Sequence, residues 1–141
     1  MNTTEERVLN ILLVEDDDVD IMNVQRAFEK NHIANPLFIA HNGLEALEML
    51  RGADVPKGRR IILLDLNMPR MNGIEFLRAL RADPALRGTP VVVLTTSSDE
   101  RDKVEAYDLH VAGYLLKPVT FANFCEVMTA LNKYWTLVEL L

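Results

Sequence analysis

The chain alternates between short apolar runs and longer segments whose apolar residues recur every three or four positions. The apolar runs predict strands, and they cover residues 8–14, 36–40, 61–65, 91–95 and 112–116. Two of them, 61–65 and 91–95, are almost continuously apolar, which is typical of parallel strands buried on both faces. The amphipathic segments predict helices at about 18–30, 43–51, 73–82, 99–109 and 120–134.

Five strand–helix repeats in succession predict a parallel α/β domain with right-handed connections. Asn42-Gly43 and Asn72-Gly73 are expected to start two of the helices, and a third is expected to start near Ser98 and Asp99. The sequence contains no linker, internal repeat or low-complexity tract. Residues 1–141 are therefore expected to form a single domain.

Composition narrows the class of protein. The 141 residues are 49% hydrophobic and 26% charged, as in ordinary soluble globular domains. No apolar run approaches the roughly 20 residues of a membrane-spanning helix, and the N-terminus lacks the layout of a signal peptide. The single cysteine, Cys125, excludes an internal disulfide, so a cytoplasmic location is expected. The net charge of −6 argues against direct binding to nucleic acid.

Polar residues stand where the predicted strands end. Glu15 and Asp16 follow the first strand, Asp65 closes the third, Thr95 closes the fourth and Lys117 follows the fifth. In an open parallel sheet the carboxyl ends of the strands lie along one edge, where ligands bind. These residues are therefore expected to converge on one site.

The chemistry of this set favours phosphoryl transfer. Three carboxylates brought together repel one another unless they are protonated or share a cation. Mg²⁺ prefers oxygen ligands and retains water, so Glu15, Asp16 and Asp65 would suffice to hold it. A carboxylate can attack phosphorus while a metal ion, the Lys117 ammonium and the Thr95 hydroxyl neutralise charge on the phosphoryl oxygens.

Four segments match the signature regions of one known family in order and spacing. They are "LLVEDD", "LLDLNMPRMNGIEFL", "VVVLTTS" and "GYLLKPV". In these segments the chain resembles the response-regulator receiver domains of two-component signalling, and the resemblance spans roughly residues 8–133. It implies an α/β, flavodoxin-like, doubly wound sheet of five parallel strands in the order 2-1-3-4-5 with five helices.

The resemblance assigns roles to the acidic residues. Asp65 would be the phosphoacceptor, and Asp16 would bind Mg²⁺ directly while Glu15 acts through water. Asn67 would add its backbone carbonyl to the metal. Mn²⁺ could substitute for Mg²⁺.

The resemblance also assigns residues around the phosphoryl group. Thr95 and Lys117 would contact it, Pro118 would follow a cis peptide bond, and Tyr114 would be an aromatic switch whose ring turns inward when Thr95 moves. One departure is Thr96, which stands where many members of the family carry a smaller residue.

By this resemblance the protein would be a stand-alone response regulator that receives its phosphoryl group from a sensor histidine kinase. It would catalyse its own phosphorylation and its own dephosphorylation without being a turnover enzyme. Its signal would leave through a protein-interaction surface formed by helix 99–109, strand 112–116 and helix 120–134.

An apolar stripe continues the last predicted helix into a helical extension at about 134–141. Its members are Phe121, Phe124, Met128, Leu131, Trp135 and Val138. The extension resembles that of small regulators that partner bacterial phytochromes, so a phytochrome-type kinase is a candidate partner. We expect a homodimer through the interaction surface and the extension; a tail folded back onto the sheet is the alternative.

The acidic run continues with Asp17, Asp18 and Asp20. Its spacing mimics the start of an EF-hand calcium loop, but Ile21 stands where glycine is required and Ala27 where a bidentate glutamate is required. We expect these three carboxylates to be solvated charges that favour the start of the next helix.

Two functions of other classes fit the sequence less well than the receiver does. A flavodoxin-like cofactor binder needs a phosphate-accepting loop after the first strand, but "EDDD" there would repel an FMN phosphate. A phosphatase with an aspartate nucleophile needs a second catalytic aspartate two residues after Asp65, where Asn67 stands. A receiver that is not phosphorylated stays open as a third alternative.

Overall fold

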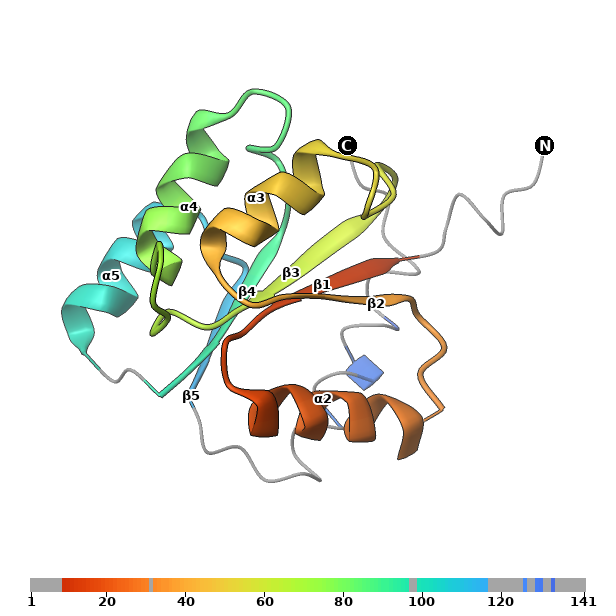
Figure 1. Cartoon of the computed structure of the whole chain (residues 1–141). Helices are drawn as coiled ribbons and strands as arrows, with labels where there is room; N and C mark the ends of the chain where they lie inside the picture. The colour runs from red at the N-terminus through yellow and green to blue at the C-terminus, as the bar shows by residue number, and fades with distance from the viewer. Residues whose placement is uncertain are drawn as a thin grey trace.

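Five parallel strands form one sheet in a computed structural model that describes residues 9–30, 32–96, 99–116, 126, 129–130 and 133 (Figure 1). The strands are β1 (Asn10–Val14), β2 (Leu37–Ala40), β3 (Arg60–Leu64), β4 (Val91–Thr95) and β5 (Gly113–Leu116). Their order across the sheet is β2-β1-β3-β4-β5. The predicted fold class, the five strands and their order are confirmed.

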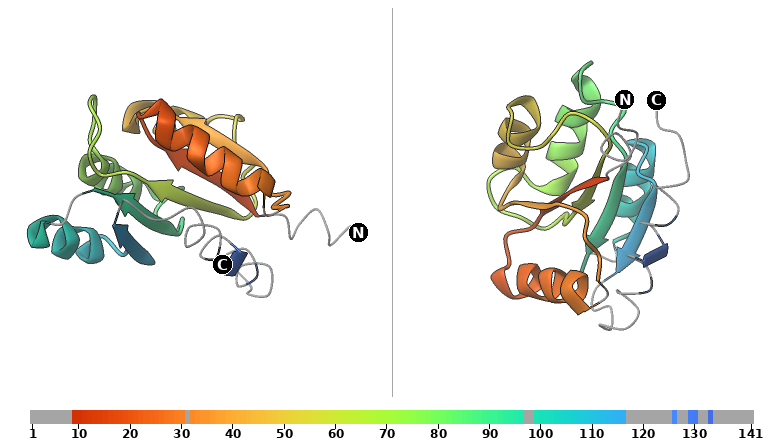
Figure 2. Two further views of the ribbon diagram at one scale, coloured as in Figure 1. Left: turned by 90° about the horizontal axis from the view of Figure 1, so that it is seen from below. Right: turned by 90° about the vertical axis from the view of Figure 1, so that its right-hand side faces the viewer.

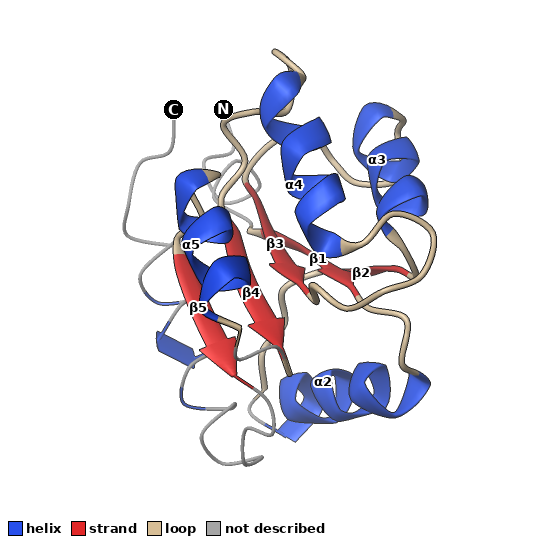
Figure 3. Cartoon of the chain, turned by 90° about the vertical axis from the view of Figure 1, so that its left-hand side faces the viewer, coloured by secondary structure: helices blue, strands red, loops and turns tan. Residues whose placement is uncertain are grey.

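Helices cover both faces of the sheet. The four that the structure delimits are α2 (Asp18–Lys30), α3 (Gly43–Arg51), α4 (Gly73–Ala82) and α5 (Glu100–Asp108). Helix α2 lies on one face, and α3, α4 and α5 lie on the other (Figures 1 and 3). The two further views in Figure 2 show the sheet as the middle layer.

The fifth predicted helix, 120–134, falls mostly outside the described residues. Four positions of that segment are helical and exposed, namely Glu126, Thr129, Ala130 and Lys133. Their spacing places them on one face of a helix, in agreement with the prediction at these positions. Cys125 and the extension at 134–141 lie outside the described residues.

The strands are apolar throughout because both of their faces are buried. Successive side chains of a strand point to opposite faces. In β1, Leu12 and Val14 pack toward α3 and α4, whereas Ile11 and Leu13 pack toward α2. The same alternation occurs in β3 and β4. The continuous apolar runs therefore correctly predicted a parallel sheet between two helical layers.

Side chains cap the helices where the sequence predicted it. Asn42 accepts a hydrogen bond from the backbone of Glu45 at the start of α3. Asn72 and Glu75 form a reciprocal capping box at the start of α4. Asp99 caps α5 through the backbone N–H of Arg101. Within the described part of the chain, no helix has both the length and the apolar character needed to cross a membrane.

Candidate functional site

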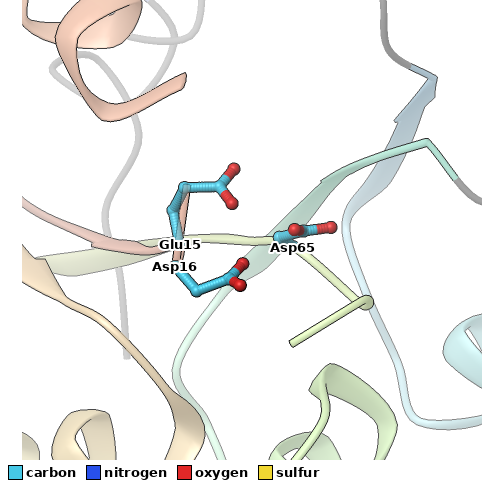
Figure 4. Close-up of side chains that lie close together, drawn as sticks. All are labelled: Glu15, Asp16 and Asp65. Carbon is cyan, nitrogen blue, oxygen red and sulfur yellow. The ribbon is translucent and has the colours of Figure 1, made fainter. Parts of the chain in front are cut away.

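Three carboxylates meet at the carboxyl edge of the sheet. Glu15 and Asp16 directly follow β1, and Asp65 directly follows β3. One oxygen from each lies within 4.8 Å of the others, and Figure 4 shows the three side chains side by side. Glu15 and Asp65 are only 2% and 6% exposed, whereas Asp16 is exposed. The predicted convergence of these residues is therefore present in the structure.

Strand pairing brings the carboxylates together. Val14 and Leu64 are partners in the β1–β3 register, so the residues that follow them leave the sheet at the same level. The Asp65 N–H donates to the carbonyl of Val14 at 3.0 Å, and the Glu15 N–H donates to the carbonyl of Ala40 at 2.9 Å. Their backbones are thus fixed before any ligand binds.

The donor set fits a hard divalent cation. It consists of oxygen only, and its charge is concentrated at an edge where two of the carboxylates are buried. Two oxygens on opposite sides of Mg²⁺ lie about 4.2 Å apart, because each is about 2.1 Å from the ion. A separation of up to 4.8 Å suits direct ligation by some of the carboxylates and ligation through water by another.

Asn67 connects the acidic group to the end of β4. Its backbone N–H donates to Asp65 Oδ1 at 3.2 Å. Its side-chain Nδ2 donates to Thr96 Oγ1 at 3.2 Å and to Thr95 Oγ1 at a longer 3.5 Å. Sequence reasoning assigned only a backbone carbonyl to Asn67 and missed this side-chain role. The sequence did offer a signal for this role: Asn67 is a polar residue two positions after Asp65, and both residues follow the end of β3.

The threonines at the end of β4 differ in burial. Thr95 is fully buried, whereas Thr96 is exposed. Thr95 is the partner of Leu116 in the β4–β5 register, so β5 ends beside it. Lys117 and Pro118 come next along the chain and lie outside the described residues. Their predicted roles therefore stay predictions.

An open cleft of about 480 Å³ lies over the acidic group. Its lining residues come from the start of α2 and from the loops after β3 and β4: Asp16, Asp17, Asp18, Val19, Asp20, Asp65, Asn67 and Thr96. The cleft gives access to Asp65, although most of that side chain is buried.

The rest of the acidic run belongs to the start of α2. Asp17 Oδ1 accepts hydrogen bonds from the N–H groups of Val19 at 2.8 Å and Asp20 at 3.1 Å. Asp18 is exposed in the first turn. The predicted helix-start role is confirmed for Asp17. The helix begins at Asp18, where an EF-hand would need an open loop, so the rejection of a calcium loop agrees with the structure.

Gly73 positions the loop that follows Asp65. Its N–H donates to the carbonyl of Leu66 at 2.9 Å. A Cβ at this position would lie only 2.6 Å from the Asp65 carbonyl oxygen and from the Leu66 Cα. The first turn of α4 therefore packs directly on the backbone after β3. Sequence reasoning used Gly73 as a helix start and missed this close approach.

Tyr114 is the remaining predicted site residue that the structure describes. It is partly buried on β5 and packs against the core on the side of α3, α4 and α5. Its ring lies beside that of Tyr107 on α5, with centroids 6.5 Å apart and planes inclined by 30°. Tyr107 was not among the predicted site residues.

Comparison with known proteins places the chain among signalling proteins. The family model for the response regulator receiver domain matches residues 11–129. The chain is 38% identical over 130 residues to the probable methanogenesis regulatory protein FilR2 of Methanothrix harundinacea, covering 89% of this chain and 82% of that protein. It is 36% identical over 128 residues to response regulator Rcp1 of Synechocystis, and the match covers 89% of this chain and 87% of Rcp1.

Solved structures agree in fold and in sequence. The phosphorylated cyanobacterial phytochrome response regulator RcpA superposes with a TM-score of 0.80 at 34% identity, covering 93% of this chain and 96% of RcpA. The Mn²⁺-bound form of Rcp1 superposes with a TM-score of 0.76 at 36% identity, covering 94% and 98%. The chain therefore belongs to the response regulator receiver domain family and is related to the phytochrome response regulators.

Proposed function

We propose that this protein is a phosphorylation-dependent response regulator that accepts a phosphoryl group on Asp65 in a reaction requiring Mg²⁺. The observation that carries the proposal is the grouping of Asp65 with Glu15 and Asp16, because two of these carboxylates, Asp16 and Asp65, line an open cleft. Carboxylates brought this close repel one another, and a cation that they share would relieve the repulsion.

The chain's own groups would act in the following way. A carboxylate oxygen of Asp65 attacks phosphorus, a new O–P bond forms, and the P–N bond to the donor imidazole breaks. The leaving nitrogen takes up a proton. The Asn67 N–H holds Asp65 Oδ1 at 3.2 Å, so the nucleophile is oriented before the donor arrives.

Glu15 and Asp16 would hold the cation together with Asp65. When bound, Mg²⁺ would neutralise charge on the carboxylates and on the phosphoryl oxygens. Thr95 Oγ1 lies within reach of the Asn67 side-chain amide, and the Asn67 backbone N–H contacts Asp65, so the Thr95 hydroxyl stands close to the acidic group. Lys117 would add a cation there, as the family resemblance implies.

The relatives support the phosphoryl and metal parts of this proposal. RcpA is known in a phosphorylated form and Rcp1 in a Mn²⁺-bound form. Members of this family partner histidine kinases, and RcpA is a phytochrome response regulator. We propose a histidine kinase as the donor for this chain, and a phytochrome-type kinase as the finer assignment. FilR2, a probable methanogenesis regulatory protein, is also similar to this chain.

The output surface would include α5 and β5. Three apolar side chains on these elements are strongly exposed: Val104 at 56%, Tyr107 at 46% and Leu116 at 49%. Exposed apolar groups that gather on one face favour a protein contact. A homodimer through this surface is part of the proposal, and sedimentation of the Val104→Glu and Leu116→Glu variants tests it. Dimers of unchanged affinity in both variants would remove α5 and β5 from the interface.

Intact mass after incubation with acetyl phosphate and Mg²⁺ tests the central assignment. The expected result is one added phosphoryl group, which is absent in Asp65→Asn and absent when a chelator is present. Asp54→Asn is a matched control, because Asp54 is exposed in the loop before β3 and should not affect labelling. Equal labelling of the Asp65→Asn protein would overturn the assignment.

A further inference from the structure

We propose that Tyr107 is a positioning residue for Tyr114. The Tyr107 ring on α5 holds the Tyr114 ring in its half-buried position and so opposes the conformational change that phosphorylation would drive. The inference rests on the proposed function of Asp65. Beyond that function, one exposed aromatic ring would set the equilibrium between the conformations of the protein before and after phosphorylation.

The contact between the two rings is specific. Their centroids are 6.5 Å apart with planes inclined by 30°, within the range at which aromatic pairs attract. Tyr107 is 46% exposed on a helix in which Ala106 is the only residue classed as buried. Burial of its own side chain therefore explains little of why a large aromatic ring stands at this position. Its contact with Tyr114 supplies a reason.

Tyr114 faces the same side of the sheet as Thr95. In the β4–β5 register, Tyr114 is the partner of Val93, and Thr95 lies two residues further along β4. Residues two apart on a strand share a face. Val93 and Tyr114 both pack toward α3, α4 and α5, so Thr95 also faces that side. The Tyr114 ring is thus a near neighbour of the site on the sheet face that α5 covers.

A continuous set of contacts leads from the acidic group to this point. Asp65 accepts from the backbone of Asn67, and the Asn67 amide donates to Thr95. The Thr95 position is then diagonal to Tyr114 across two paired strands. If Thr95 moves toward a phosphoryl group on Asp65, space opens beside it on the face where Tyr114 lies. The Tyr114 ring can enter that space only by leaving Tyr107.

Helix α5, which carries Tyr107, is held against α4 by several contacts. The preceding turn of α5 is joined to α4 by the ion pair between Glu105 and Arg78. Arg81 of α4 donates from Nε to the carbonyl of Leu109 at 2.7 Å and from Nη2 to the carbonyl of His110 at 3.0 Å, just beyond the end of α5. These links fix the half of α5 that carries Tyr107. The Tyr107 ring therefore resists displacement when Tyr114 moves.

Removal of the Tyr107 ring should shift the conformational equilibrium toward the state in which the Tyr114 ring occupies the space beside Thr95. An aromatic pair of this kind changes an equilibrium constant by about twofold to tenfold. Because coupling between two sites is reciprocal, the same factor should appear in the affinity of Asp65 for a phosphoryl mimic. Tyr107→Ala should therefore bind beryllofluoride in the presence of Mg²⁺ about twofold to tenfold more tightly than the wild type.

The experiment uses ¹⁹F NMR of the full chain labelled with 3-fluorotyrosine. The sequence contains three tyrosines, Tyr107, Tyr114 and Tyr134, and single Tyr→Phe variants assign their signals. Beryllofluoride is titrated into the wild type, Tyr107→Ala and Tyr107→Phe. Leu44→Ala is the control, because Leu44 is an apolar side chain that is 50% exposed on α3, outside the surface proposed for output, and has no aromatic ring.

In Tyr107→Ala, the Tyr114 signal should lie part of the way toward its beryllofluoride-bound position before any ligand is added. Tyr107→Phe keeps the ring and should behave as the wild type does, as should Leu44→Ala. An unchanged Tyr114 signal and an unchanged affinity in Tyr107→Ala would overturn the inference, and so would an equal change in Leu44→Ala. Equal binding of beryllofluoride by Asp65→Asn would instead overturn the proposed function.

Discussion

The Nδ2 of Asn67 donates a hydrogen bond to Thr96 Oγ1 at 3.2 Å and thereby joins the loop after β3 to the loop after β4. Both side chains line the cleft over Asp65. The bridge therefore lies in the wall of the cleft through which water or a small phosphoryl donor would reach the carboxylate. Asn67 and Thr96 are therefore placed to control access to the proposed phosphoacceptor.

Asn67→Ala and Thr96→Val each remove one partner of this bridge. Both substitutions should raise the rate of labelling by acetyl phosphate, by up to about tenfold if the barrier falls by about 1.4 kcal/mol. Labelling is followed by intact mass over time. Because the two residues act through one bridge, the double variant should be no faster than the faster single variant. Fully multiplicative rates in the double variant would show that the bridge does not limit access.

Gly73→Ala should destabilise the fold and disturb Asp65. The new Cβ would meet backbone atoms at 2.6 Å, and backbone cannot yield as a flexible side chain can. We expect a loss of about 2 kcal/mol or more in the free energy of unfolding, measured by urea denaturation. Gly88→Ala is the control, since a Cβ there meets nothing within 4 Å. It should be neutral or stabilise the protein by up to about 1 kcal/mol. Equal stability of the two variants would refute the close-packing argument.

Asp16→Asn and Asp18→Asn should separate the metal-binding carboxylates from the helix-start carboxylates. Both residues are exposed and both line the cleft, but only Asp16 belongs to the acidic group with Glu15 and Asp65. Isothermal titration with Mg²⁺ should show an affinity at least about tenfold weaker for Asp16→Asn, because one charged ligand of a hard cation is lost. The affinity of Asp18→Asn should change by less than about threefold, as expected for a screened surface charge. The reverse order of the two affinities would contradict the assignment of Asp16.

Arg81→Met should weaken the attachment of α5. The guanidinium donates to four backbone carbonyls at 2.7–3.0 Å, those of Arg87, Thr89, Leu109 and His110. Methionine keeps the apolar stem and leaves these carbonyls without that donor, so we expect a loss of about 2–4 kcal/mol in the free energy of unfolding. Arg101→Met is the control, because Arg101 is 92% exposed and pairs only locally with Asp99 among the described contacts. Chemical denaturation that ranks the two variants equally would refute the anchoring role of Arg81.

Local patterns along the chain were enough to predict the two helical layers, the sheet between them and the edge of the sheet where the site lies. Continuous apolar runs imply strands buried on both faces, and the parallel connections between them bring their carboxyl ends to one edge. Glu15, Asp16 and Asp65 could be assigned to one group on that basis, because strand ends are fixed by local pattern and direction. The starts of α3 and α4 at Asn42 and Asn72 were predictable for the same reason, since capping is a local interaction.

The side-chain contacts between loops could not be predicted from these patterns and became visible in the folded chain. Three contacts are of this kind: the hydrogen bond from Asn67 to Thr96, the packing of Gly73 against the backbone of Asp65, and the ring contact between Tyr107 and Tyr114. Each joins residues that are separated in the sequence and are brought together by the path of the chain between them. Hydrophobic periodicity carries no information about such contacts, because they depend on loop conformation and on distances of a few ångströms. They are also the contacts that we propose to control access to Asp65 and the position of Tyr114.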